Sequence, residues 1–95
     1  MAISKISGKT QIRTVQKSVS ISANGTAHFN LKTLIDADLP SGYRYGGLAG
    51  YDTGSASVFA IAVRYGDTDY SMHLKSIYSG ALTPTVSVYY VAIAE

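Results

Sequence analysis

The stretch that decides the fold lies near the end of the sequence and reads Thr85-Val86-Ser87-Val88-Tyr89-Tyr90-Val91-Ala92-Ile93. In its second half, apolar side chains fall on both alternating faces of an extended strand. A strand with two apolar faces must be covered on both sides. The sequence therefore places this strand either inside a β-sandwich or at a contact between subunits.

Composition favours self-association. The 95 residues are 46% hydrophobic and 15% charged, and they include no cysteine. So small a domain buries a modest share of its surface and needs a further source of stability. Disulfides are excluded, and no Cys/His cluster indicates a metal or other cofactor, so association is the remaining source. Charged residues usually make up about a quarter of a domain, so the low share agrees with surface lost to partner subunits. We expect a homo-oligomer whose interface includes Val86, Val88, Tyr89, Tyr90, Val91 and Ile93.

The net charge of +2 comes from an N-terminal excess of Lys5, Lys9, Arg13 and Lys17, since no acidic residue precedes Asp36. A nucleic-acid footprint usually has a denser basic patch, so we interpret these residues as a solvated face and expect no nucleic-acid partner. No apolar run approaches the roughly 20 residues of a membrane helix, and no secretory signal is evident. We therefore expect synthesis in the cytoplasm without membrane insertion.

Turn signals divide the sequence into short strands. Residues 1–14 are interpreted as an N-terminal arm and residues 15–95 as one β-sandwich domain. Alternation over 15–22, the turn formers Asn24-Gly25 and a return strand near 27–32 predict a first hairpin. Residues 33–42 break the period of two and predict a single helical turn or a plugging loop, ended by Pro40 and Gly42.

The second half predicts four more strands. Glycines within 43–51 indicate a short or kinked strand. Residues 58–65 are apolar on both faces, which suggests a central or interfacial strand, and 70–77 should form a hairpin with it. With the terminal strand, the pattern predicts an all-β fold with at most one short helical turn: a compact antiparallel β-sandwich, jelly-roll-like or a flattened barrel, of six to seven strands.

Two pairs of aspartates are candidate catalytic or metal-binding residues. Asp36/Asp38 and Asp67/Asp69 have the spacing of an acid and base pair or of partial calcium ligands, but both fall in predicted turns, where aspartate bonds its own backbone. Turn chemistry is the favoured interpretation.

Two histidines and eight tyrosines complete the candidates. His28 and His73 occupy the polar side of predicted strands, and neither a cysteine nor a Gly-x-Ser-x-Gly elbow accompanies them, so we predict no enzyme. Most tyrosines lie near strand ends and turns, where a ring with a hydroxyl can seal a subunit contact or stack on a sugar. Interface packing is the favoured role.

Several segments resemble a known class of module. They are VSISANGT at 19–26, SGY at 41–43, GLAGYDTG at 47–54 and TPTVSVYYV at 83–91. Together they resemble the small β-sandwich heads that end many tail-fibre and baseplate proteins of bacteriophages and prophages. The resemblance covers about residues 15–93. It implies a homotrimeric component of the virion tail, made in the host cytoplasm, that contacts other tail proteins and either binds a host-surface saccharide or caps a fibre.

A receptor-binding head would use aromatic and acidic groups to stack on and hydrogen-bond a sugar. The predicted contact residues are Tyr43, Tyr45, Tyr51, Asp52, Tyr65, Asp67, Asp69 and Tyr70. The alternative is an architectural connector or decoration protein, in which the same tyrosines are buried between subunits. A small glycan-processing enzyme ranks last, because it needs two carboxylates about 5 to 9.5 Å apart in one cleft and the sequence offers only turn aspartates.

Overall fold

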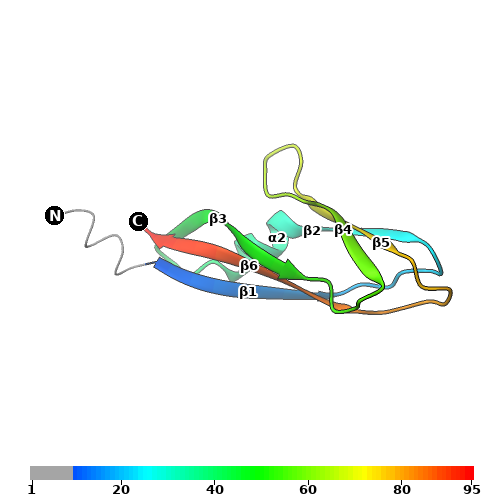
Figure 1. The fold of residues 1–95 in the computed structure, drawn as a ribbon. Coiled ribbons are helices and arrows are strands. Elements are labelled where there is room, and N and C mark those ends of the chain that lie inside the picture. Colours follow the sequence, from blue (N-terminus) through cyan, green and yellow to red (C-terminus); the bar gives the residue numbers. More distant parts are fainter. Residues whose placement is uncertain (1–9) are drawn as a thin grey trace.

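The computed structural model describes residues 10–95, which form an elongated body of 55 × 25 × 18 Å (Figure 1). Its elements in chain order are β1 (Thr10–Ser18), β2 (Thr26–Asn30), α2 (Leu31–Asp38), β3 (Tyr43–Asp52), β4 (Val58–Val63), β5 (Ser71–Ser76) and β6 (Thr85–Ala94). No helix in this part of the chain has the length and apolar character needed to cross a lipid bilayer.

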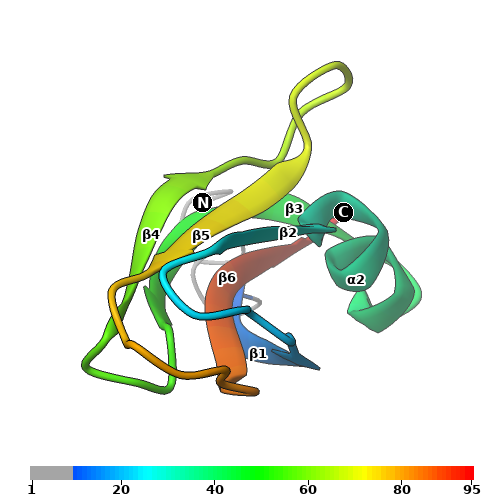
Figure 2. The ribbon, with the colours of Figure 1, turned by 90° about the vertical axis from the view of Figure 1, so that its right-hand side faces the viewer.

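The strands form two antiparallel sheets of three. The first sheet has the order β1-β6-β3, and the second has the order β2-β5-β4. Figure 2 shows the two sheets as separate layers, with α2 at one side. The all-β sandwich that the sequence predicts is confirmed.

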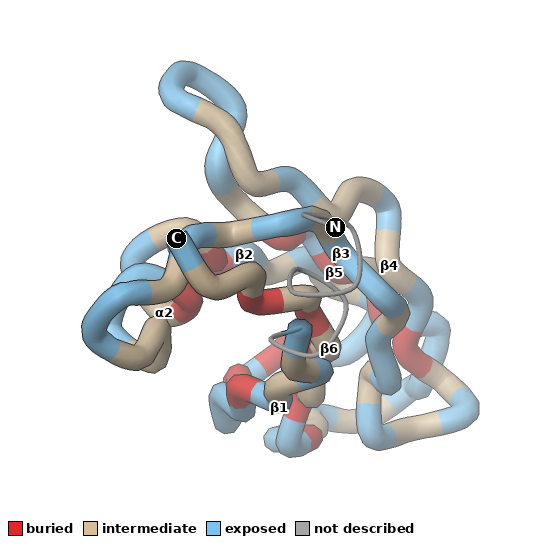
Figure 3. The backbone as a smooth tube through the Cα atoms, turned by 90° about the vertical axis from the view of Figure 1, so that its left-hand side faces the viewer, coloured by how far each residue is buried: buried red, intermediate tan, exposed pale blue. Residues whose placement is uncertain are grey.

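Strand β6 is the central strand of the first sheet, and one of its faces forms the middle of the core (Figure 3). Each fully buried Val, Leu or Ile side chain stabilises the fold by about 1.5–3 kcal/mol. The core contains Val15, Val19, Ile21, Phe29, Leu31, Ile35, Val58, Met72, Leu74, Val86, Val88, Tyr90 and Ala92.

This core corrects part of the expected oligomer interface. Val86, Val88 and Tyr90 are at most 1% exposed within a single protomer, because the second sheet and α2 cover this face of β6. They need no second copy to bury them. Tyr89, Val91 and Ile93 alternate with them along the strand, are half-buried, and remain predicted interface residues.

The Asn24-Gly25 turn is confirmed, but the hairpin expected around it is wrong. Gly25 N donates to Ser22 O at 2.9 Å, and Asn24 adopts a φ of 52°. The flanking segments nevertheless separate, since β1 pairs with β6 and β2 pairs with β5. The turn instead docks on the β5–β6 connection: Asn24 N donates to Tyr78 O, and Ser76 N donates to Gly25 O, each at 2.9 Å.

Strands β4 and β5 form the hairpin that the sequence predicts. However, β4 is an edge strand rather than a central one. Its second apolar face is exposed, with Ile61 at 62% exposure. The sequence pattern shows that both faces are apolar, but it does not show whether a neighbour covers both.

Strand β3 has the kinks that its glycines predict. Its register with β6 shifts between Tyr45 and Gly47 and again between Leu48 and Gly50. Gly46 also leaves room for the side chain of Ile93, because a Cβ atom at Gly46 would lie 2.5 Å from Ile93 Cδ1. The glycines therefore allow β6 side chains to lie across β3.

The predicted helical turn is a helix of eight residues, and it begins earlier than expected. The Asn30 side chain accepts from Thr33 N at 2.9 Å and caps the helix, so the residues after β2 turn directly into α2. Leu31 and Ile35 bury one face of the helix in the core. The helix ends at Asp38, before Leu39 and Pro40, as a proline requires of the residue preceding it.

The expected N-terminal arm overlaps the first sheet. Strand β1 begins at Thr10, which pairs with Ile93, and so residues 10–14 belong to the sandwich. The remainder of the arm, residues 1–9, lies outside the described residues.

Candidate functional site

Four of the predicted contact residues lie on the β4–β5 loop, residues 64–70, which projects from the body (Figure 2). They are Tyr65, Asp67, Asp69 and Tyr70. Tyr70 is 40% exposed, and the carboxylate of Asp69 lies 3.3 Å from Arg64 Nε. The loop therefore presents an aromatic ring and acidic groups to solvent.

Two predicted residues from different elements meet beside this loop. The rings of Tyr45, on β3, and Tyr65 stack with their centroids 3.7 Å apart and their planes inclined by 22°. Lys32 Nζ, from α2, lies 4.9 Å from the Tyr65 centroid. Tyr65 is thus held between a second ring and a cation, and it is only half exposed.

Asp36 joins the same group and fixes the loop to the helix. It accepts from Lys32 Nζ at 2.8 Å and from the Tyr65 hydroxyl at 2.6 Å. The Lys32 bond, and then the Tyr65 bond, hold the pKa of Asp36 below its ordinary value. The i,i+4 spacing of Lys32 and Asp36 is the one sequence signal for this group. It indicates an ion pair only if the segment is helical, because residues four apart are neighbours on a helix.

Asp38, two residues further along, forms a second clamp. It accepts from Arg13 Nε at 2.9 Å and from the Tyr90 hydroxyl at 2.6 Å. These bonds lower the pKa of Asp38, with Arg13 as the larger cause. Burial and the bond to Asp38 raise the pKa of Tyr90 to about 12. Asp36 and Asp38 thus lie on a helix and bind side chains, which corrects their interpretation as turn aspartates.

The other three predicted contact residues do not join the Tyr45–Tyr65 stack. Tyr43 packs against the core at the start of β3. Tyr51 and Asp52 lie at the opposite end of that strand, where Tyr51 is 49% exposed and Asp52 Oδ1 accepts from Gly54 N at 2.8 Å. The eight residues therefore form no single site, because β3 places its two ends apart.

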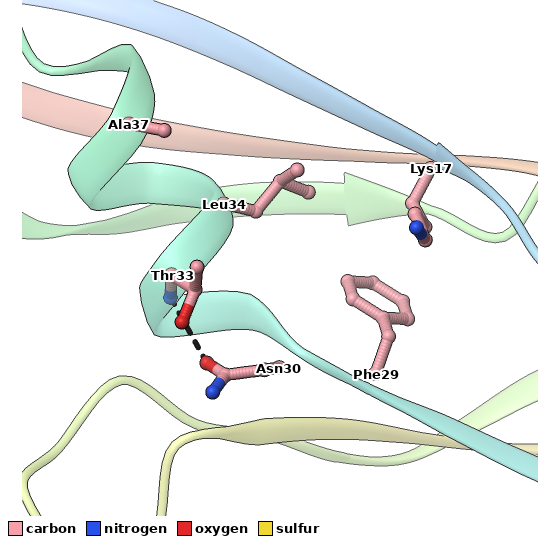
Figure 4. A pocket seen from close by; sticks show the side chains of 6 residues that line it. All are labelled: Lys17, Phe29, Asn30, Thr33, Leu34 and Ala37. Atoms are coloured by element: carbon pink, nitrogen blue, oxygen red, sulfur yellow. Dashed lines mark hydrogen bonds between the residues drawn. The ribbon is translucent and has the colours of Figure 1, made fainter.

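A cavity of about 480 Å³ lies between α2, β1 and β2 (Figure 4). Its walls are largely apolar, and the amine of Lys17 lies at one side. Its lining residues are Lys17, Phe29, Asn30, Thr33, Leu34 and Ala37. None of them belongs to the predicted contact set. They are brought together by α2, which packs beside β1 and β2.

The outer face of the first sheet is apolar at its centre. Residues paired across strands share a face, so Ile12 lies beside Val91, and Thr14 lies beside Tyr89. Ile12 is 64% exposed, whereas Tyr89 and Val91 are half-buried. We call Ile12, Tyr89, Val91 and Ile93 the outer apolar stripe. On its β1 side it is flanked by the uncharged Thr10, Thr14 and Gln16. On its β3 side, Arg44 is the partner of Ile93, and Asp52 is the partner of Ser87, so that side carries charges.

Within residues 10–95, no three His, Cys, Asp or Glu side chains gather in a way that could hold a metal ion. His28 and His73, expected on polar faces, are both exposed and stack on each other. No family model matches the chain, and neither a curated protein nor a solved structure matches it.

Proposed function

We propose that this chain is a non-enzymatic module of a phage tail that assembles as a homotrimer and presents its 64–70 loop to a host-surface saccharide. The phage setting rests on the resemblance of the sequence to tail-fibre heads. In this proposal the protein is made in the host cytoplasm, becomes part of the virion and contacts other tail proteins. The observation that carries the proposal is the outer apolar stripe.

The stripe favours contact between copies of the chain. Among residues 10–95, Ile12 is the most exposed of the large apolar side chains, and it stands beside the half-buried Val91. On the β1 side of the stripe the neighbouring groups are uncharged. Covering the β1 side of this face removes apolar surface from water without stripping water from a charge. Three copies would also give three weak ligand sites the avidity that one lacks.

The projecting loop supports the receptor role. Tyr70 offers an exposed ring, and Asp67 and Asp69 offer hydrogen-bond acceptors within the same loop. Aromatic rings with nearby acceptors suit the apolar face and the hydroxyls of a sugar ring. Tyr65, held by Tyr45 and Asp36, anchors the loop to the body rather than offering a free ring.

The architectural connector is the second candidate, and the Tyr45–Tyr65 stack favours it. Both rings already have partners within the protomer, so they are less suited to receive a sugar. A connector would share the outer apolar stripe but would not need a ligand on the loop. The two candidates therefore differ only in the role of residues 64–70.

Assembly is tested by two substitutions at matched exposure. Ile12→Lys places a charge on the outer apolar stripe, whereas Ile61→Lys places one at a position of 62% exposure on β4. We expect size-exclusion chromatography with light scattering to show that Ile12→Lys lowers the mass to one chain while Ile61→Lys leaves the oligomer intact. Equal behaviour of the two variants would contradict assembly through this stripe.

The ligand is tested separately on the intact oligomer. We expect an array of bacterial surface saccharides to show binding that Tyr70→Ala and Asp67→Ala abolish and that Tyr51→Ala preserves. An oligomer that binds no saccharide would leave the connector as the function. An effect of Tyr51→Ala equal to that of Tyr70→Ala would remove the loop as the binding site.

A further inference from the structure

The outer face of the second sheet brings together the only two histidines of the sequence. His28 on β2 is the direct antiparallel partner of His73 on β5. Their ring centroids are 5.3 Å apart, and the ring planes are inclined by 24°. Both residues are exposed, so solvent and dissolved ions reach the pair.

The imidazoles have no competing partners in the described part of the chain. Among residues 10–95, no hydrogen bond or ion pair engages either ring, so their nitrogen lone pairs are not committed to another residue. The next pairs along the two strands are Asn30 with Ser71 and Thr26 with Lys75. On the other side of β5, His73 pairs with Ala62.

Lys75 is the one charged group on these flanking positions, and its ammonium donates to the carbonyl oxygen of Asn24, at the turn before β2. No carboxylate lies among the flanking residues that would pair with a histidine as an imidazolium. The pair is therefore a set of two nitrogen donors on a sheet face, without an acidic partner. Stacking between exposed cross-strand side chains is itself a weak interaction.

We propose that His28 and His73 together bind a divalent transition-metal ion, with one nitrogen of each ring as a ligand. Imidazole nitrogen suits zinc, copper and nickel, which it binds at about 2.0–2.1 Å in the case of zinc. The paired strands hold both rings on one face, and rotation of the rings about their side-chain torsions turns a nitrogen of each toward a shared ion. Because the backbone holds the two donors together, the second nitrogen binds with little further loss of freedom.

This site differs from a closed structural centre. Only two protein donors are present, so water or donors of another molecule occupy the remaining positions. The ion should follow the usual affinity order for nitrogen ligands, with Cu²⁺ bound more tightly than Ni²⁺ or Zn²⁺, and Ca²⁺ or Mg²⁺ should not bind.

Calorimetric titration of the full chain with Cu²⁺, Ni²⁺ and Zn²⁺ tests the proposal. The variants are His28→Thr, His73→Thr and the double variant, since threonine suits an exposed strand position. We expect one ion per chain for the unaltered protein, at least tenfold weaker binding for each single variant, and no binding at this site for the double variant. Single variants that bind as tightly as the unaltered chain would overturn the proposal.

A second measurement locates the ion without relying on affinity. In an NMR spectrum, substoichiometric Cu²⁺ should broaden the amide signals of His28, His73 and their strand neighbours first. Broadening centred elsewhere, or the absence of any binding by Cu²⁺ at millimolar concentration, would contradict the site. Circular dichroism of each variant confirms that the fold persists, so a loss of binding reports the loss of a ligand.

Discussion

The hydroxyl of Tyr90, in the centre of the core, donates a 2.6 Å hydrogen bond to Asp38 Oδ2, on the last residue of α2. Tyr90 is fully buried, and its own ring forms part of the sandwich interior. Arg13, on β1, donates to the same oxygen at 2.9 Å. One carboxylate therefore connects the end of the helix to two neighbouring strands of the first sheet.

Replacing Tyr90 with phenylalanine should destabilise the protein by about 1.5–3 kcal/mol, because it removes a hydrogen bond to a charged group and keeps the packing of the ring. Urea unfolding measures this change in the free energy of unfolding. The control is Tyr78→Phe, at a tyrosine that is 48% exposed, which should change the free energy of unfolding by less than about 0.5 kcal/mol. Equal effects of the two substitutions would contradict the role of the Tyr90–Asp38 bond.

The stability of the fold should fall in acid, because hydrogen bonds and ion pairs stabilise the ionised carboxylates of Asp36 and Asp38. Their folded pKa values lie below the ordinary value of 3.8, chiefly through Lys32 and Arg13. A lowered pKa contributes stability above the unfolded value and loses it as the pH falls through the folded value. We expect the free energy of unfolding to decline below about pH 4, with a smaller decline in the double variant Asp36→Asn/Asp38→Asn.

Tyr90 should produce an opposite dependence in alkali. Its pKa is raised from 10.0 to about 12, first by burial and then by Asp38. A raised pKa contributes stability that is complete below the unfolded value and is lost as the pH rises through the folded value. Unfolding monitored between pH 10 and pH 12 should show this loss, and Tyr90→Phe should remove much of it. An identical alkaline profile in both proteins would contradict this assignment.

Alanine substitutions at two glycines distinguish the cost of backbone strain from the cost of a steric clash. Gly42 and Gly54 have φ values of 83° and 79°, so alanine is strained at both. A Cβ atom at Gly54 would lie 2.4 Å from Thr85 O, whereas one at Gly42 would meet nothing within 4 Å. Thermal unfolding should show a cost of about 1–2 kcal/mol for Gly42→Ala and a larger cost for Gly54→Ala. Equal costs would show that the backbone at Thr85 moves freely.

The cap of α2 should be worth about 1 kcal/mol. Asn30→Ala removes the side-chain oxygen that accepts from Thr33 N, whereas Asn30→Asp keeps an acceptor there. Chemical unfolding of both variants measures the difference. An alanine variant as stable as the aspartate variant would mean that water replaces the cap without cost.

Local chemistry made much of the fold predictable. The period of two indicated the strands, the glycines of β3 indicated its kinks, and Asn24-Gly25 indicated its turn. The β4–β5 hairpin was predictable because its two strands are neighbours in sequence. Each of these features depends on residues that lie close together along the chain.

Pairing over long separations was not predictable in the same way. An alternating strand shows which residues share a face but not which strand lies beside it, so the partners of β1 and β2 were assigned wrongly. The helix was underestimated because Asn30 fits both a strand position and a helix cap. The clamps on Asp36 and Asp38 depend on that helix, and therefore the sequence pattern did not indicate them.

The central claim is that copies of this chain cover each other's outer apolar stripe, Ile12, Tyr89, Val91 and Ile93. Light scattering on the purified protein, over a range of concentrations, measures its mass in solution most directly. We predict the mass of three chains. A mass of one chain at every concentration would contradict the claim, and with it both the receptor-binding head and the connector.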